Sequence, residues 1–408
     1  MQSPWAWAQK EALDLVFREL VASENLVLDQ EGGGGRSGHP AAKIHLRLPN
    51  LYWTIRILLK PDLMVGQTYV DDRWYVPPAE LYDFLHLIRS KDGSSLQRWF
   101  LLSNSLHPIR DLFKQRFFPI RSTRAVAEHY DTDPEFVSLV LGRSLSYTCA
   151  FFREDTTSLD VAQRNKLNLI AHRISLAEGM TVLDIGSGWG YATFPLAEDY
   201  GCTVTGITIS KAQVQFCVAR QMTSAAANRL SFINVDYAHF NPPQRFDRAI
   251  AVGMLEHVGK YQYTRFFDKV SDLITDQGAA LIHCIVSEEE SSPDAWIDRH
   301  IFPGGYIPTI SEVVRGIENS RCQLVQIFTE SQSSYFKTLQ SWKENLINNW
   351  DRATYIFRRK GLKNREIEAI LKIWAYFLAA SQISFSPEFG KCRTAQFLVR
   401  NLAYSQTI

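Results

Sequence analysis

Thr181-Val-Leu-Asp-Ile-Gly-Ser-Gly-Trp-Gly190 is the stretch that decides the fold of this chain. Its apolar residues are typical of a buried parallel strand: Val182, Leu183 and Ile185. The acid Asp184 lies within this strand, and three glycines follow at alternate positions: Gly186, Gly188 and Gly190. Glycines let the backbone turn tightly and approach a ligand before a helix, expected here over 191–199. The run therefore predicts the first strand and turn of a nucleoside-binding sheet. By itself it fits a dinucleotide, S-adenosylmethionine or no ligand.

Strand and helix patterns alternate from about residue 160 onward. The predicted strands cover 181–185, 202–207, 230–234, 246–252 and 279–285, and the helices between them include 211–227 and 261–273. This order predicts an α/β, Rossmann-like, doubly wound sheet. Ligands of such sheets bind beyond the carboxyl ends of the strands, so we look for chemistry there.

Length and composition set limits on the class of protein. A chain of 408 residues with 46% hydrophobic and 21% charged residues suits two domains or one enlarged domain. The net charge of +1 gives no reason to expect a nucleic-acid partner. The six cysteines are scattered, so neither a metal site nor disulfides are expected. The chain start resembles no signal peptide, and no apolar run approaches a membrane span, which predicts a cytoplasmic protein with at most peripheral membrane contact.

The region before the sheet predicts a small α+β domain over 1–105. It contains a helical pattern at 6–22, a glycine loop at 32–35, strands at 43–48 and 53–59, and a helix that begins at Pro77-Pro78. A linker over 106–128 follows, and 129–408 is the predicted catalytic domain. Basic and aromatic residues interleave over 107–124, which fits either a solvated linker or docking onto anionic headgroups. A second basic run, over 358–365, has the same two interpretations.

Polar residues follow the predicted strands. After the second strand, 208–213 lacks the acid that a dehydrogenase would place against the ribose, which argues against NAD. Asp236-Tyr237 follows the third strand and suits an adenine amine and ring. Glu256 follows the fourth strand, and His283 lies near the end of the fifth. Each also has a structural interpretation, as a helix-start carboxylate and as a core histidine.

In content and order, these motifs resemble the cyclopropane-fatty-acid-phospholipid synthases and the related mycolic acid methyltransferases. The resemblance covers roughly 124–400, and the stretch over 61–73 also resembles the smaller amino-terminal domain of the full-length enzymes. The motifs are His129-Tyr-Asp131, Ser146 to Phe152, Leu159 to Leu167, Val182 to Gly190, Gly206 to Ser210, Val252 to Gly259, Trp296 with Ile301 to Pro308, and Tyr335 with Thr338, Leu339 and Trp342.

The resemblance implies a class I S-adenosylmethionine-dependent methyltransferase fold and assigns two sets of residues. The cofactor-binding set is Tyr147, Thr148, Asp184, Gly186, Gly188, Gly190, Thr208, Ser210, Gln213, Asp236 and Tyr237. The catalytic set, which in the family contacts an active-site bicarbonate ion, is Cys149, Glu256, His283, Ile285 and Tyr335. No metal is implied.

The activity implied is transfer of a methyl group from S-adenosylmethionine to the cis double bond of unsaturated acyl chains in membrane phospholipids. A cyclopropane ring forms through a carbocation that bound bicarbonate deprotonates. A base is needed because the alkene has no lone pair to quench the cation. The alternatives are a methyl-branched alkene, a methylene-branched chain, or a non-catalytic lipid-binding protein. The implied partner is an anionic membrane surface at the inner face, and the family suggests a homodimer, although the sequence does not itself reveal the oligomeric state.

Two departures and one aromatic group complete the comparison with the family. Asp133-Pro134 stands where Gly-Asn or Ser-Asn is common, which puts the choice of lipid in doubt, and Ser187 replaces a common cysteine. Four aromatic residues are candidates either for the wall of an acyl channel or for ordinary core packing: Phe151, Phe152, Trp296 and Tyr306.

Overall fold

The computed structural model describes residues 26–29, 36–38, 44–47, 52–53, 56–57, 60–90, 133–156, 158–290 and 294–402. Predictions for 6–22, the glycine loop, His129-Tyr-Asp131 and the basic segment over 107–124 lie outside these residues. The chain divides into two compact units. The first comprises 1–112, 294–301 and 346–383, and the second comprises 113–293, 302–345 and 384–408.

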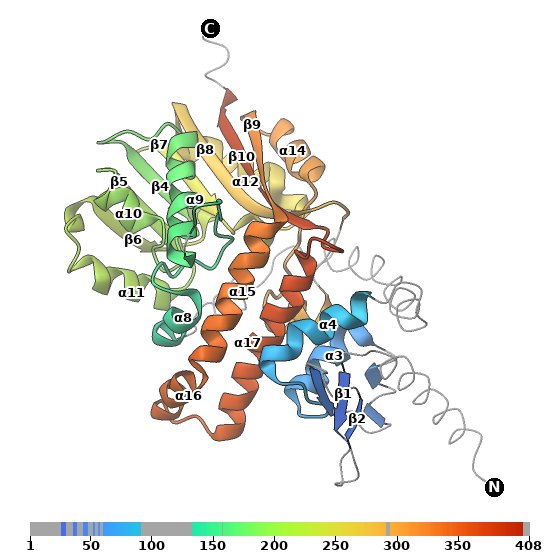
Figure 1. The fold of residues 1–408 in the computed structure, drawn as a ribbon. Coiled ribbons are helices and arrows are strands. Elements are labelled where there is room, and N and C mark those ends of the chain that lie inside the picture. Colours follow the sequence, from blue (N-terminus) through green and yellow to red (C-terminus); the bar gives the residue numbers. More distant parts are fainter. Residues whose placement is uncertain are drawn as a thin grey trace. The chain divides into compact units, whose positions relative to one another are not determined.

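A seven-stranded sheet forms the centre of the second unit, in the order β6-β5-β4-β7-β8-β10-β9 (Figure 1). The strands are β4 Thr181–Ile185, β5 Thr203–Thr208, β6 Leu230–Asn234, β7 Phe246–Val252, β8 Ile274–Ser287, β9 Cys322–Glu330 and β10 Cys392–Asn401. Neighbouring strands from β6 to β8 pair in parallel, whereas β10 is antiparallel to both β8 and β9. The predicted α/β doubly wound fold is confirmed.

The apolar runs of the sequence locate most of this sheet. β4, β6 and β7 have the predicted bounds, β5 is displaced by one residue, and β8 begins five residues earlier than predicted. Helices α11 Lys211–Gln221 and α12 Tyr263–Leu273 lie inside the predicted helical stretches. β9 and β10 were not predicted.

Helices cover both faces of this sheet and create two cores. On one face, α12 and α14 Ile310–Glu318 pack on inward residues such as Ile282 and Phe397. On the other face, α9 Leu159–Arg173, α10 Thr193–Glu198 and α11 pack on residues such as Leu281 (Figure 1). Because side chains alternate along a strand, His283 and Ile285 share the α9 face with Leu281.

The first unit combines a three-stranded sheet with helices. The sheet has the order β2-β1-β3, with β2 antiparallel and β3 parallel to β1. Its elements are β1 Leu26–Asp29, β2 Arg36–Gly38, β3 Ile44–Arg47, α3 Pro61–Val70, η1 Pro78–Glu80, α4 Leu81–Ser90, α13 Ala295–His300, α16 Trp350–Arg359 and most of α17 Asn364–Ser384. The strand predicted over 43–48 and the helix after Pro77-Pro78 are confirmed.

The strand predicted over 53–59 is wrong. The described residues 52–53 and 56–57 are helical, and the amide of Lys60 donates to the carbonyl of Arg56 at 3.1 Å. The Arg56 guanidinium also donates to the Tyr52 hydroxyl one helical turn earlier, at 2.9 Å. A short apolar run fits a strand or a helix equally well, so periodicity could not decide between them.

Helices α3 and α13 approach closely in the first unit at Gly66. A Cβ atom on Gly66 would lie 2.6 Å from Tyr376 and 2.8 Å from Trp296. Both α13 and α17 fall within the predicted 129–408 domain, yet they cluster with the amino-terminal residues. The functional division into 1–105, 106–128 and 129–408 stays a prediction. Across the described ranges, no helix is both long and apolar enough to cross a membrane.

Two glycines of the second unit allow a matched test of packing. Gly190 and Gly179 have φ values of +80° and +81°. A Cβ on Gly190 would lie 2.6 Å from the Phe194 ring, whereas one on Gly179 would meet nothing within 4 Å. We expect Gly179→Ala to lower the free energy of unfolding by about 1–2 kcal/mol through the backbone alone. Gly190→Ala should lower it by a further ~1–3 kcal/mol because the core is overpacked. Urea denaturation measures both, and equal losses would contradict this packing.

Candidate active site

A cavity of about 810 Å³ lies at the carboxyl ends of β4, β5, β6 and β7. Such an edge is where ligands of doubly wound sheets bind. Nine of the eleven residues predicted to bind the cofactor line it: Tyr147, Thr148, Asp184, Gly186, Gly188, Thr208, Gln213, Asp236 and Tyr237. These nine residues come from four segments of the chain: 147–148, 184–188, 208–213 and 236–237.

The other two predicted cofactor residues shape the loops behind this wall. Gly190 makes room for the Phe194 ring at a backbone φ of +80°. The Ser210 hydroxyl accepts a hydrogen bond from the Gln213 amide at 3.2 Å and so begins α11. The Thr208 hydroxyl donates to Gln213 Oε1 at 2.8 Å, which fixes that side chain at the cavity.

Two acids of the cavity wall are held by local hydrogen bonds. Asp184 Oδ2 accepts from the Thr193 hydroxyl at 2.6 Å, and burial raises the pKa of this carboxyl to about 6. Asp236 Oδ1 accepts from the Ala238 amide at 2.9 Å. The Tyr237 ring packs edge-on against Phe266, with centroids 5.3 Å apart. Asp236 and Tyr237 thus both line the cavity, and their binding of an adenine stays a prediction.

Helix α9 holds the segment 146–152 from one side. The Phe151 amide donates to the carbonyl of Ala162 at 3.0 Å, and Gln163 Nε2 donates to the carbonyl of Thr148 at 3.0 Å. Lys166 Nζ donates to the hydroxyl of Thr148 at 2.6 Å and to that of Ser146 at 2.9 Å. Because Thr148 lines the cavity, α9 positions part of the cavity wall.

Helix α15 Gln332–Asn348 holds the same segment through its amino-terminal turns. The Ala150 amide donates to the Thr338 hydroxyl at 2.9 Å, and the Phe152 amide donates to the Ser334 hydroxyl at 3.2 Å. The segment is therefore clamped between two helices. Side chains of α15 bond to it on one side, and both main-chain and side-chain atoms of α9 bond to it on the other.

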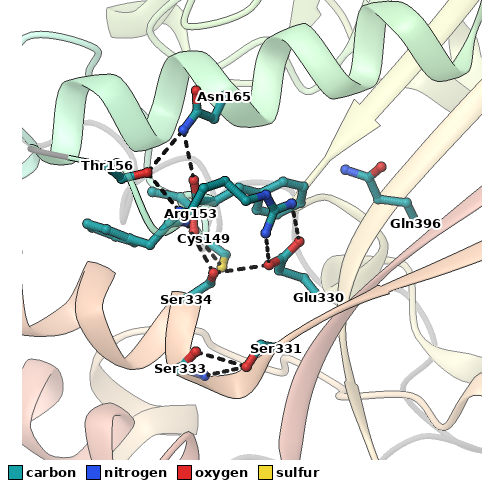
Figure 2. Close-up of polar contacts among 12 residues, drawn as sticks. Cys149, Arg153, Thr156, Asn165, Glu330, Ser331, Ser333, Ser334 and Gln396 are labelled. Atoms are coloured by element: carbon teal, nitrogen blue, oxygen red, sulfur yellow. Dashed lines mark hydrogen bonds and ion pairs between the residues drawn. The ribbon is translucent and has the colours of Figure 1, made fainter.

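Figure 2 shows the outer end of this clamp. The Arg153 guanidinium donates to both oxygens of Glu330, at 2.6 and 2.9 Å, and the Ser334 hydroxyl donates to Glu330 Oε1 at 3.1 Å. Asn165 Nδ2 donates to the Thr156 hydroxyl at 3.2 Å. This ion pair joins Arg153, directly after the 146–152 segment, to Glu330 at the end of β9.

Lys166 is a buried lysine that the sequence analysis did not single out. It is fully buried, and burial lowers the pKa of its ammonium group to about 7. Its Nζ lies 4.3 Å from the centroid of the Tyr191 ring. Its position within the 159–167 motif was the available signal, but only the fold reveals the hydroxyls it contacts.

Glu256 is the buried carboxyl of the predicted catalytic set. Its Oε1 accepts from the Ile285 amide at 2.8 Å, and its buried Oε2 has no hydrogen-bond partner among the described residues. Burial raises the pKa of this carboxyl from its ordinary value of 4.5 to about 7. Ile285, which the resemblance assigns to the bicarbonate site, thus has its amide bonded to Glu256.

His283 lies opposite Gln396 on the neighbouring strand, and its Nδ1 is 3.2 Å from Gln396 Nε2. The imidazole is buried, which lowers its pKa well below the ordinary range, and the positive charges of Lys166 and Arg173 lower that pKa further. The Phe151 ring lies 5.7 Å from the imidazole centroid. His283 is therefore neutral.

Cys149 and Tyr335 complete the predicted set. Burial raises the pKa of the Cys149 thiol to about 12, even though the hydroxyls of Thr338 and Thr394 lower it. Thr394 is paired directly with Ile285 across β10 and β8. The Tyr335 ring lies 4.2 Å from the Phe385 centroid and 6.4 Å from that of Trp342. None of the five residues lines the cavity, but Thr148 and His257, their chain neighbours, do.

The aromatic residues that were candidates for an acyl channel lie in different surroundings. Phe151 lies beside His283, whereas Trp296 belongs to the first unit, where its ring is 4.6 Å from that of Tyr376. Tyr306 donates to Glu312 Oε1 at 2.7 Å. Other rings adjoin the cavity residue Tyr147: Trp342 at 5.6 Å and Phe302 at 6.0 Å.

Several residues near the site were missed from the sequence. Thr394 and Gln396 come from β10, and Glu330 ends β9, so missing these strands hid them. Gly253 allows a close approach, because a Cβ there would lie 2.4 Å from the Thr148 methyl carbon. In the part of the chain that the structure describes, no three His, Cys, Asp or Glu side chains gather closely enough to bind a metal ion. All six cysteines are buried and free.

The two departures from the family pattern lie at a helix start and at a buried position of the glycine turn. Asp133 Oδ1 accepts from the Phe136 amide at 3.0 Å, and Pro134 is the first residue of α8 Pro134–Leu141. Asp-Pro is thus a helix start at this position. The Ser187 hydroxyl is buried and has no hydrogen-bond partner among the residues that the structure describes. It lies 2.9 Å from where a Cβ atom on Gly206 would be.

The raised pKa of Glu256 makes a prediction about stability. A carboxyl whose pKa is higher in the folded state favours folding at low pH, and this contribution is lost as the pH rises from about 4.5 to about 7. Relative to Glu256→Gln, the wild type should lose on the order of 3 kcal/mol of unfolding free energy over this window and then level off. Urea denaturation between pH 4.5 and 8 measures the difference. Glu154→Gln, at an exposed position, should parallel the wild type; parallel curves for Glu256→Gln as well would contradict the prediction.

Known proteins are similar to this chain in sequence and in fold. The family model described as mycolic acid cyclopropane synthetase matches residues 119–395. The chain is 29% identical over 323 residues to the cyclopropane-fatty-acyl-phospholipid synthase of Escherichia coli (strain K12), covering 77% of this chain and 79% of that protein.

Two solved structures share the fold over about two thirds of this chain. The cyclopropane synthase MmaA2 from Mycobacterium tuberculosis superposes with a TM-score of 0.61 at 25% identity, covering 68% of this chain and 98% of that one. The mycolic acid cyclopropane synthase CmaA1, complexed with SAH and CTAB, gives a TM-score of 0.61 at 26% identity, covering 69% and 99%. The chain therefore belongs to the mycolic acid cyclopropane synthetase family and is an S-adenosylmethionine-dependent methyltransferase of the cyclopropane-fatty-acyl-phospholipid synthase type.

Proposed function

We propose that this enzyme converts the cis double bond of unsaturated acyl chains in membrane phospholipids to a cyclopropane ring. The observation that carries the proposal is a polar cluster around β8: Glu256 bonds the amide of Ile285, two residues after the buried His283, and Thr394 opposite Ile285 acts on the Cys149 thiol. Cys149 and Glu256 are also next in the chain to residues of the cofactor cavity. The proton is lost only after methylation, from the cation formed on the acyl chain. The reaction therefore needs a base inside the apolar site that holds this cation. Methyl transfer would break the sulfur–methyl bond of the donor, which leaves as a thioether, and form a carbon–carbon bond that leaves a cation on the acyl chain. Loss of a proton from the new methyl group closes the ring.

The cavity residues bind and orient the methyl donor in this proposal. S-adenosylmethionine supplies the methyl group from a sulfonium ion. Asp236 and Tyr237 suit its adenine, while Gly186 and Gly188 let the backbone come close to it. Thr148 is fixed on the opposite side by Gln163 and Lys166. This clamp supports a fixed position for the reacting carbon, on which the rate of such a displacement depends steeply.

We propose Glu256, His283 and Tyr335 as the residues that hold a bicarbonate ion, with Cys149 and Ile285 beside them. The ion would supply a base whose pKa lies near the working pH. One buried atom without a partner among the described residues supports the fit: Glu256 Oε2. The carboxyl oxygen of Glu256 and the Tyr335 hydroxyl can accept hydrogen bonds, while that hydroxyl and the N–H of a neutral His283 can donate. Together they match an ion that has both O–H and O⁻ groups.

The protonation of Cys149 argues for a supporting role. A thiolate beside a sulfonium would itself be methylated, but the pKa of about 12 keeps this sulfur protonated near neutral pH. A neutral thiol also adds no negative charge that would compete with an anionic base. The Phe151 ring beside His283 offers its face to a developing cation, an interaction of about 2 kcal/mol when desolvated.

We also propose peripheral association with the anionic inner face of the cytoplasmic membrane. Its support in the described residues is the basic run at α16 and the turn that follows. The exposed side chains there are Tyr355, Arg358, Arg359, Lys360 and Lys363. Each basic residue near such a surface contributes about 1 kcal/mol. The homodimer stays an expectation from the family resemblance.

Isotope labelling of the methyl group tests the reaction. The protein is incubated with S-adenosylmethionine that carries a fully deuterated methyl group and with vesicles of a cis-unsaturated phospholipid. We expect two deuteriums in the modified acyl chain, because ring closure removes one from the methyl group. Mass spectrometry counts them, and proton NMR of the unlabelled product separates a cyclopropane from a methylene branch. Three retained deuteriums would show methylation without ring closure and would overturn the proposal.

Variants of the base-holding residues test the mechanism. Glu256→Gln and His283→Asn should lower turnover by roughly 10²–10⁴-fold, because they act on the base. Both should leave the Kd for S-adenosylmethionine within a few-fold of wild type, measured by calorimetry, because neither residue lines the cavity. Glu154→Gln is the matched control and should behave as wild type. Normal turnover in both variants would remove these residues from the mechanism.

A further inference from the structure

Three side chains form one row across neighbouring strands on the α9 face of the sheet. His283 on β8 is paired with Gln396 on β10, and Gln396 is paired with Phe328 on β9. Directly paired residues of antiparallel strands lie side by side on one face. His283 and Gln396 are both buried. The row therefore leads from the partly buried Phe328 to the inner imidazole.

Arg173, the last residue of α9, lies over this row. Its guanidinium is 4.0 Å from the centroid of the Phe328 ring. The same guanidinium donates a hydrogen bond to Gln396 Oε1. Stacking on Phe328 and bonding to Gln396 fix the guanidinium in two directions.

Only one assignment of donors and acceptors fits the hydrogen bonds that run from Arg173 through Gln396 to His283. A guanidinium can only donate, so the Gln396 atom that faces it is the oxygen. The Gln396 atom that faces His283 is then Nε2, which donates to Nδ1 at 3.2 Å. A ring nitrogen that accepts a hydrogen bond carries no proton. The imidazole is consequently neutral, with its proton on Nε2.

We propose that Arg173 and Gln396 are positioning residues that fix His283 as the neutral tautomer protonated on Nε2. The catalytic meaning of this tautomer rests on the proposed function. With Nδ1 bonded to Gln396, the Nε2–H is the group of His283 that is left to donate to an anion. Rotation of the Gln396 amide would place two donors against each other at Arg173 and would allow His283 the other tautomer.

The charges around the imidazole support the same form. The charged groups that act on His283 are Lys166 and Arg173, both on α9, and each disfavours an imidazolium. The Phe151 ring covers another side. The positive charge of Arg173 thus has two roles, orienting Gln396 and opposing protonation of His283.

Nitrogen NMR of the whole protein, labelled with ¹⁵N-histidine, reads the tautomer directly. Long-range proton–nitrogen correlations distinguish a protonated from an unprotonated ring nitrogen, and the spectrum of His283→Asn assigns the signals. In the wild type we expect a protonated Nε2 and an unprotonated Nδ1 between pH 6 and 8. A proton on Nδ1 in the wild type would overturn the proposal without any variant.

Substitutions in the row should change this signature in a set direction. Gln396→Glu places an acceptor against both neighbours, so the proton should appear on Nδ1. Arg173→Met should give a measurable Nδ1-protonated fraction, whereas Arg173→Lys, which keeps a donor, should restore the wild-type form. Arg393→Gln, on the same strand but in an exposed ion pair with Glu288, is the control and should change nothing. An unprotonated Nδ1 in Gln396→Glu, or in Arg173→Met when Gln396→Glu does not fold, would overturn the proposal.

Kinetics separate this inference from the proposed function. Gln396→Glu should lower kcat at least about tenfold, as expected for a wrong tautomer, and leave the Kd for S-adenosylmethionine unchanged. Unchanged kcat with an inverted tautomer would show that the row does not serve the reaction and would overturn the positioning role. If the wild type made no cyclopropane yet showed the expected tautomers, the proposed function would fail and the structural role of Arg173 and Gln396 would stand.

Discussion

The hydrogen bonds from α9 to the 146–152 segment are the constraint on which the rest of the site depends. Gln163 and Lys166 fix Thr148, which lines the cofactor cavity, and Ala162 fixes Phe151, which lies beside His283. One helix therefore sets both the wall that faces the methyl donor and the inner wall of the polar cluster. Movement of this segment would change the two sites together, because its main-chain groups have been taken out of water and have these atoms as partners.

Burial then decides the electrostatics of the site. It lowers the pKa of Lys166 to about 7 and that of His283 well below its usual range, and it raises the pKa of Glu256 to about 7 and that of Cys149 to about 12. Each shift favours the neutral form, since low-dielectric surroundings penalise any charge. Because these four groups are shifted toward their neutral forms, they add little charge that would compete with the interaction between the cationic methyl donor and the proposed anionic base.

Particular elements show how far the sequence predicted the fold. β4, β6 and β7 were located because each is a compact apolar run that ends at a polar or glycine turn. The run over 53–59 was misread because its apolar spacing suits a helix as well as a strand. β9 and β10 were missed because many of their residues are polar. Thr394 and Gln396 are buried only because Ile285 and His283, more than a hundred residues earlier, lie directly opposite.

The sequence by itself determined the parallel sheet, the glycine turn and the residue types of the cofactor edge, because these depend on local backbone preference and apolar periodicity. It also provided Cys149, Glu256 and His283, through motifs that resemble a known family. Only the tertiary structure decided that Ile285 bonds Glu256, that α9 clamps the 146–152 segment and that Arg173 reaches His283 through Gln396. These contacts join residues far apart in the chain, and a pKa or a tautomer is set by neighbours in space rather than by neighbours in sequence.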